Sequence, residues 1–144
     1  MKEKNEQKPL VGIALIIIKD KKDVLLGKRK GSHGEGTWSF PGGHLKYCES
    51  IERCSRRESK EETGLTEANI KLIDKRPHTI TEDLFPEGLH YITLYLRAKY
   101  LNGFPKVIEP DKCEIWKWFS WGNLPSPLFL PIRNLIKQGY NPFE

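Results

Sequence analysis

A very polar helix framed by glycines is the feature that most constrains the fold. Pro41-Gly42-Gly43 predicts a sharp turn, because proline fixes φ and the two glycines permit positive φ. Residues 50–63 then predict a helix that Gly64 ends. Only Ile51 and Cys54 are plainly apolar along it. A helix this polar normally lies on the surface, so we expect it to owe little to core packing.

Three glutamates share one face of this predicted helix. Glu58, Glu61 and Glu62 stand at i, i+3 and i+4, where like charges repel by roughly 0.2–0.5 kcal/mol per pair. Arg57, four residues before Glu61, supplies some compensation. A divalent cation would supply more, since carboxylate oxygens are the ligands that Mg²⁺ prefers. Taken alone, the glutamates favour an ordinary solvated helix over a metal site.

The other predicted elements surround this helix in an order typical of a mixed sheet. The hydrophobic pattern predicts one amphipathic helix at 131–138 and strands at 10–19, 24–30, 38–40, 69–75, 89–100 and 113–120. The order β-β-β-α-β-β-β-α indicates an α+β protein with helices packed on a mixed sheet. Trp116 and Trp118 share one face of the last strand, which favours the core or a dimer interface. We expect a polar tail at 1–9 and a single domain at 10–144.

The composition of the chain limits the kinds of partner and the cellular compartment that we expect. The net charge of +5 is spread along the chain, and the Lys28-Arg29-Lys30 triplet is too short for a nucleic-acid tail, so a small polyanion is the expected partner. No apolar run approaches the roughly 20 residues that span a bilayer. The three cysteines form no CxxC pair, which argues against a disulfide framework or a zinc site. The basic, polar N-terminus lacks a signal-peptide cleavage site, so we expect a cytoplasmic protein.

The spacing around the helix forms a longer motif. Gly43 is followed after five residues by Glu49, and seven residues later come Arg57-Glu58, Glu61-Glu62 and Gly64-Leu65. This segment resembles the Nudix box at every fixed letter, and chance matching is on the order of 10⁻⁵ to 10⁻⁶ for this composition. One position departs from the family pattern: Ser59 replaces the apolar residue that anchors the helix on the sheet. The resemblance therefore predicts a somewhat weaker docking of this helix.

The resemblance implies an α/β/α sandwich with a Mg²⁺ site, in which Mn²⁺ can substitute. Its metal ligands would be the carbonyl of Gly42 and the carboxylates of Glu58, Glu61 and Glu62. Arg57 would orient these catalytic glutamates by charge-assisted hydrogen bonds, while Glu49 would support the helix from behind.

Hydrolysis of a diphosphate also needs a group that takes the proton of the attacking water. Glu61 is one candidate. Among glutamates outside the box, Glu114 is the first choice because it starts the aromatic strand, although an exposed strand glutamate is an equally good interpretation.

The likeness covers nearly the whole chain, roughly residues 10–143. The segments LLGKRKGSHGEGTWSFPGGHL, EPDKCEIWKWFSWGNLP and QGYNPF resemble the cytosolic MutT-type nucleoside triphosphate pyrophosphohydrolases of plants and animals. Such enzymes release a nucleoside monophosphate and pyrophosphate from modified nucleotides. The resemblance implies substrate contacts of two kinds. Arg29 would contact a phosphate, and the residues that would line the pocket of the base are Phe40, Gly43, His44, Phe129 and Leu130. For Phe40, Phe129 and Leu130, plain core packing stays open.

Several alternatives remain at this level. The substrate could instead be ADP-ribose, a dinucleotide or a prenyl diphosphate. A different class of function is a non-catalytic Nudix module that senses a nucleotide or binds RNA. The expected partner is a small nucleotide or another diphosphate, with no nucleic acid and no membrane, and the relatives leave a homodimer as an option.

Overall fold

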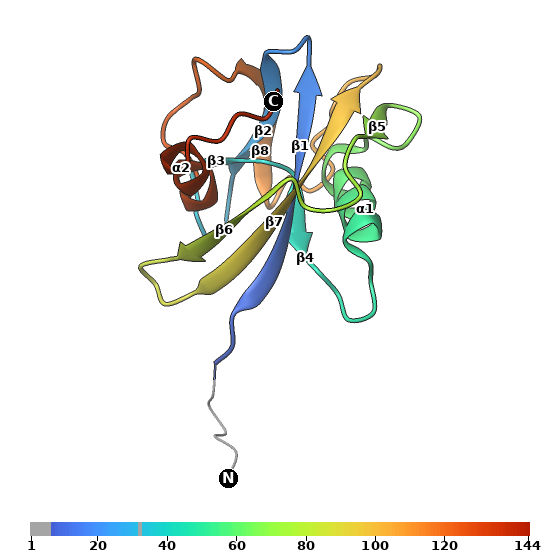
Figure 1. Cartoon of the computed structure of the whole chain (residues 1–144). Helices are drawn as coiled ribbons and strands as arrows, with labels where there is room; N and C mark the ends of the chain where they lie inside the picture. Colours follow the sequence, from blue (N-terminus) through green and yellow to red (C-terminus); the bar gives the residue numbers. More distant parts are fainter. Residues whose placement is uncertain (1–6, 32) are drawn as a thin grey trace.

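A mixed sheet of eight strands forms the centre of the protein, and one helix lies on each side of it (Figure 1). The computed structural model describes residues 7–31 and 33–144. Most of the predicted tail at 1–9 therefore lies outside the described residues. The strands are β1 (Leu10–Lys19), β2 (Asp23–Arg29), β3 (Trp38–Ser39), β4 (Gly42–His44), β5 (Ile70–Leu72), β6 (Thr79–Leu84), β7 (His90–Tyr100) and β8 (Cys113–Ser120), and the helices are α1 (Ile51–Thr63) and α2 (Leu130–Lys137). The predicted fold class, a mixed sheet flanked by helices, is confirmed.

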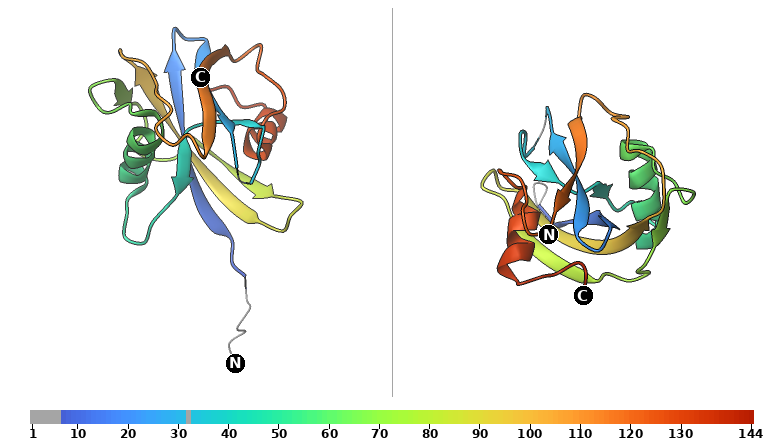
Figure 2. Two further views of the ribbon diagram at one scale, coloured as in Figure 1. Left: turned by 180° about the vertical axis from the view of Figure 1, so that it is seen from behind. Right: turned by 90° about the horizontal axis from the view of Figure 1, so that it is seen from above.

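Strand β1 runs through the middle of the sheet and is covered on both faces. It pairs in parallel with β7 from Leu10↔Tyr91 to Ile18↔Lys99, and antiparallel with β4 and β2 along its other edge. Leu15 belongs to the core cluster on the α1 side, whereas Ile16 belongs to the cluster that contains Leu135 of α2. A strand buried on both faces explains the almost uninterrupted apolar run. Figure 2 shows the two helices on opposite sides of the sheet from two further directions.

The ends of α1 follow the sequence signals. The Ser50 hydroxyl accepts a hydrogen bond from the Arg53 N–H at 3.1 Å, which caps the start of the helix. Gly64 ends it in the left-handed conformation at φ 76°. The predicted helix is thus confirmed at both ends.

The sheet-facing side of α1 is more buried than its polarity suggests. Ser55, Ser59 and Thr63 are all 0% exposed. Each hydroxyl donates internally: Ser55 Oγ to the Glu52 carbonyl at 2.8 Å, Ser59 Oγ to the Leu65 carbonyl at 3.0 Å, and Thr63 Oγ1 to the Ser59 carbonyl at 2.6 Å. The helix lies at the surface as expected, with Arg53, Lys60 and Glu61 exposed. Because buried polar groups are tolerated when they are paired, its inner face packs more closely than its polarity suggests, and a weaker docking at Ser59 stays a prediction.

The glycine pair was predicted as a turn, but it lies in a strand. Gly42 and Gly43 belong to β4, pair with Ala14 and Ile13 of β1, and have no positive φ. Their role is close approach: a Cβ on Gly42 would collide with the Ile13 carbonyl, and one on Gly43 with the carboxylate of Glu58. Two missing side chains therefore let β4 pass directly beneath the glutamates of α1.

Strand β6 was not predicted, because its polarity is inverted. Thr81 and Asp83 face the interior, where they are 2% and 0% exposed, while Ile80 and Leu84 face outward. The buried Asp83 carboxylate accepts hydrogen bonds from Thr81, Thr93 and the Asn134 side chain. Strand β5, in turn, is shorter than the predicted 69–75.

The tryptophans of β8 belong to the core. Trp116 is 9% exposed and its indole N–H donates to the Glu62 carbonyl at 3.2 Å. Trp118 packs on the same cluster and contacts Tyr100 edge to face. The core interpretation is confirmed. No helix in the described part of the chain is long and apolar enough to cross a membrane.

Candidate active site

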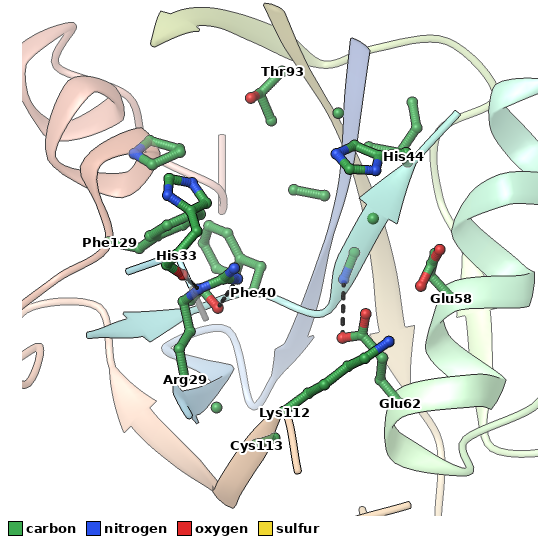
Figure 3. A pocket seen from close by; sticks show the side chains of 18 of the residues that line it. Arg29, His33, Phe40, His44, Glu58, Glu62, Thr93, Lys112, Cys113 and Phe129 are labelled. Atoms are coloured by element: carbon green, nitrogen blue, oxygen red, sulfur yellow. Dashed lines mark hydrogen bonds between the residues drawn. The ribbon is translucent and has the colours of Figure 1, made fainter. Parts of the chain in front are cut away.

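A cleft of about 470 Å³ opens between α1, the sheet and the start of α2. Its two sides differ in chemistry (Figure 3). We call the carboxylates on one side the acidic wall: Glu58, Glu61, Glu62 and Glu109. We call the rings on the other side the aromatic wall: His33, Phe85, Tyr91 and Phe129.

Arg57 holds the box glutamates in place. Its guanidinium donates to Glu49 at 2.6 and 3.0 Å, to Glu58 at 2.9 Å and to Glu61 at 3.1 Å. It also donates to the His44 carbonyl at 3.3 Å, which ties α1 to β4. The repulsion expected between neighbouring glutamates is therefore offset by one arginine. The predicted orienting geometry is present, although its part in catalysis stays a prediction.

Glu49 lies behind this arginine. The hydrogen bonds from Arg57 lower the pKa of Glu49 to about 2, and the Lys46 N–H adds to that effect at 3.1 Å. In the other direction, the Glu49 carboxylate raises the pKa of Arg57. The pair is thus ionised at any ordinary pH, as a fixed support requires.

Glu62 differs from Glu49, because its pKa is raised instead of lowered. Burial first, then the neighbouring carboxylate of Glu58 and, more weakly, Glu109, together raise the pKa of Glu62 to about 9. Its Oε1 accepts the Gly42 N–H at 3.3 Å, which lowers the pKa only in part. Carboxylates crowded in this way are stable as anions only beside a cation.

The donor set fits a hard divalent cation such as Mg²⁺, which takes oxygen ligands. Glu58 and Glu62 offer carboxylates toward the same space, and Gly43 has no side chain to fill it. Within residues 7–31 and 33–144, no three acidic, histidine or cysteine side chains already converge on one ion position. The ligand assignment, including the Gly42 carbonyl, therefore stays a prediction.

The structure does not place Glu114 at the site. Its side chain is 57% exposed, pairs with Lys28 at 3.8 Å and does not line the cleft. Glu109, in the loop before β8, lines the cleft instead and pairs with Lys112 at 3.8 Å. The expectation that Glu114 is the extra base does not fit this geometry. The β2–β8 register shifts between Gly27 and Arg29, so Glu114 and Ile115 stand opposite one residue of β2, and both are exposed while Cys113 and Trp116 are buried.

Arg29 lies across the cleft from the acidic wall (Figure 3). Its Nε donates to the His33 carbonyl at 2.9 Å, and its guanidinium lies 4.1 Å from the centroid of the Phe129 ring. Burial lowers the pKa of Arg29, while the charge of Glu62 opposes that shift. A held cation inside the cleft is suited to a phosphate, as predicted.

The residues around β4 take different positions. Phe40 is 6% exposed and belongs to the α2-side core, yet it also lines the cleft, so both interpretations of this residue apply. Gly43 and His44 line the cleft as well. The His44 ring stacks on Tyr91 at 5.5 Å and its Nε2 lies 2.7 Å from the Tyr91 hydroxyl. These residues border the cleft where a substrate would lie.

Only one of the two residues that were predicted to wall the base pocket, Phe129 and Leu130, borders the cleft. Phe129 lines it as part of the aromatic wall, whereas Leu130 does not. Leu130 is the first residue of the helix. Its direction differs from that of Phe129, because successive helical residues are rotated by about 100° around the axis. Pro131 and Ile132 line the cleft in its place.

Comparison with known protein families shows to which family this chain belongs. A model described as "NUDIX domain" matches residues 8–138. The chain belongs to the NUDIX domain family. A curated relative from Vibrio vulnificus, named NAD-capped RNA hydrolase NudC, is 30% identical over 128 residues, which are 86% of this chain and 44% of the relative. An ADP-ribose pyrophosphatase from Methanocaldococcus jannaschii is 33% identical over 121 residues, which are 84% of this chain and 68% of the relative.

Among solved structures, the MutT NUDIX hydrolase from Burkholderia pseudomallei superimposes with a TM-score of 0.78 at 31% identity, over 93% of this chain and 100% of that one. The NUDIX domain of NrtR from Shewanella oneidensis, complexed with ADP ribose, has a TM-score of 0.70 at 19% identity, over 96% of this chain and 91% of that one, and supports the fold alone. The Nudix chain spans less than half the length of the NudC proteins it matches. These relatives come from microorganisms, so the narrower likeness to plant and animal enzymes is not supported.

Several residues that line the Nudix cleft were not predicted from the sequence. Those with charged or aromatic side chains include His33, Phe85, Tyr91, Glu109 and Lys112. A signal did exist for Glu109, which opens the segment EPDKCEIWKWFSWGNLP that resembles relatives outside the box. Of the aromatic wall, Phe129 was predicted, and His33 lies in the segment LLGKRKGSHGEGTWSFPGGHL, which also resembles relatives. Phe85 and Tyr91 lie in no segment with such a likeness.

Proposed function

We propose that this Nudix domain hydrolyses a diphosphate linkage in a nucleotide-like substrate with Mg²⁺ as cofactor. The observation that carries the proposal is the crowding of Glu58, Glu62 and Glu109 around one end of a cleft that has Arg29 at its other end. Crowded carboxylates at one end provide a cation site, and a held arginine at the other provides an anion site. A diphosphate with bound magnesium satisfies both.

The residues that line or support the cleft would have separate roles in the reaction. Arg57 keeps Glu58 and Glu61 in position. Arg29 and Lys112 would bind phosphate oxygens from two sides. A water oxygen forms a bond to one phosphorus, the bridging P–O bond breaks, and the proton of the water passes to a carboxylate. We assign that carboxylate to Glu109 or Glu61, which both line the cleft. When bound, the metal ion supplies charge neutralisation and a more acidic water.

As substrate we propose a modified nucleoside triphosphate, which would yield a monophosphate and pyrophosphate in the cytoplasm. The cleft has room for a nucleotide at about 470 Å³. A second candidate is ADP-ribose or a dinucleotide, because curated relatives carry the names ADP-ribose pyrophosphatase and NAD-capped RNA hydrolase. The latter name also makes the end of a capped RNA a partner to test, against the sequence-based expectation of no nucleic acid.

A product-identified assay tests the proposal. The protein is incubated with and without Mg²⁺ on oxidised and normal dNTPs, ADP-ribose, NADH, NAD-capped RNA and geranyl diphosphate. We expect magnesium-dependent cleavage of at least one nucleotide, with products that locate the broken bond. Tight nucleotide binding without turnover of any substrate would instead support the non-catalytic Nudix module.

A further inference from the structure

The aromatic wall contains a polar atom without a partner. Among the buried side-chain nitrogen and oxygen atoms in the described part of the chain, one makes no hydrogen bond, and that atom is His33 Nε2. Leaving a buried polar atom unpaired is unfavourable, because the atom gives up its hydrogen bonds to water and gains none in return. Such atoms are rare in folded proteins, and each one calls for a physical reason.

The His33 ring is held in place from several sides. Its Nδ1 lies 2.7 Å from the Glu87 carboxylate, which belongs to the turn between β6 and β7. The ring packs edge to face against Phe85 at 4.2 Å and against Phe129 at 5.3 Å. Its carbonyl accepts the Arg29 Nε–H at 2.9 Å. The unpaired nitrogen is therefore a fixed feature of the wall.

The contact with Glu87 determines what Nε2 can do. A carboxylate at Nδ1 keeps the proton on that nitrogen, so Nε2 of the neutral ring is an acceptor. The neighbouring rings of Phe85 and Phe129 carry no N–H or O–H to satisfy it. Phosphate oxygens are acceptors as well and cannot pair with it. The missing partner is thus an N–H or O–H donor.

We propose that His33 is a specificity-determining residue, whose Nε2 accepts a hydrogen bond from an N–H or O–H on the organic part of the substrate. The position supports this choice, since His33 lies beside Arg29 and Phe129, across the cleft from Glu58 and Glu62 (Figure 3). The phosphates would lie between the acidic wall and Arg29, and a heterocyclic base would lie on the other side of Arg29, against the aromatic wall. The inference rests on the proposed function and deepens it, because it favours a base with an amino or imino group over a prenyl chain.

Calorimetric titration with Mg²⁺ at pH 8 tests this inference, with AMP, GMP, geranyl diphosphate and inorganic pyrophosphate as probes. His33→Phe keeps an aromatic ring and removes the acceptor. We expect AMP or GMP to bind about tenfold more weakly, which corresponds to one lost hydrogen bond, while pyrophosphate and geranyl diphosphate bind as to the parent.

The matched control is His90→Phe. His90 Nε2 lies 2.9 Å from Glu82 in the same hairpin, so the control removes a similar histidine–glutamate pair that does not line the cleft. It should leave all four affinities unchanged. An equal loss for pyrophosphate in His33→Phe, or no loss for the nucleotides, overturns the assignment.

Nitrogen NMR of the parent protein gives a second readout that does not depend on a variant. With ¹⁵N-labelled histidine, the His33 Nε2 resonance should move from an unpaired toward a hydrogen-bonded acceptor when AMP or GMP is added. An unchanged resonance in the nucleotide complex, or no nucleotide binding at all, overturns the inference. A shifted resonance in a protein that cleaves no diphosphate would refute the proposed function while the binding role stands.

Discussion

The two walls of the cleft are built by different physical means. The acidic wall consists of charges that one arginine holds in place: Arg57 bonds Glu49, Glu58 and Glu61. The aromatic wall consists of rings that hold one another, with His33 between Phe85 and Phe129. Substitutions in the acidic wall should therefore slow the chemical step, whereas substitutions in the aromatic wall should change which substrate is bound. The predictions below test this division.

The largest effect is expected at Glu62. Glu62→Gln keeps the shape and removes the charge that we propose for the metal site, so kcat/KM for the best diphosphate should fall by about 10³-fold, which is roughly 4 kcal/mol. Steady-state kinetics at saturating Mg²⁺ measures this. The control Glu114→Gln, outside the cleft, should retain full activity. If the Glu62→Gln variant turned over as fast as the parent, the acidic wall would have no part in the mechanism.

The next effect concerns Arg57. Arg57→Ala removes the hydrogen bonds that orient three carboxylates, so we expect a loss of about 2–3 kcal/mol in the free energy of unfolding and about 10²-fold in kcat/KM. Urea unfolding and kinetics measure the two losses. Arg56→Ala is the matched control, because Arg56 lies on the same helix but outside the cleft, where it pairs with Glu52 of that helix and with Glu67 beyond its end. It should cost less than about 0.5 kcal/mol. Equal losses in the two variants would mean that the network only stabilises the helix.

A smaller effect is expected in the aromatic wall. Phe129→Ala should raise KM about tenfold while kcat changes less than about threefold, because a ring that packs on the base would contact it equally in the ground and transition states. Phe104→Ala, at a ring that is 84% exposed, should change neither parameter. If kcat fell more than KM rose at Phe129, the division between the two walls would fail.

The smallest effect depends on pH. Because the pKa of Glu49 is lowered to about 2, its ion pair stabilises the fold above the ordinary carboxyl pKa of about 4.5. That stabilisation is lost as the pH falls from there toward 2. The parent should therefore be more stable than Glu49→Gln at pH 7, and the difference should shrink below pH 4.5. Urea midpoints at pH 7, 4.5 and 3 measure it, and a difference that grows toward pH 3 would contradict the assigned ion pair.

The two walls also differ in how far the sequence predicts them. The box glutamates, Arg57 and Gly64 occupy one helix and its ends, so their spacing fixes their relative positions before any tertiary contact forms. The structure brings Glu58, Glu61 and Glu62 to the cleft accordingly. The helix ends at 50 and 64 were predictable for the same reason, because capping depends on nearby residues.

The remaining features depend on long-range contacts. His33 meets Glu87 across 54 positions of sequence, and no local pattern encodes that meeting. Strand β6 escaped prediction because Asp83 is buried where an apolar residue is expected. Gly42 and Gly43 were assigned to a turn because glycine commonly signals positive φ, whereas the need here is close packing against β1 and Glu58. Such errors mark places where tertiary contacts outweigh local preference.

The central claim is that the acidic wall holds a divalent ion against a phosphate chain. The most direct test is anomalous diffraction from crystals soaked in Mn²⁺ together with AMP. The account predicts an ion within bonding distance of the Glu58 and Glu62 carboxylates and of a phosphate oxygen. An ion bound elsewhere, or none beside these glutamates in a protein that Mn²⁺ activates, would contradict it.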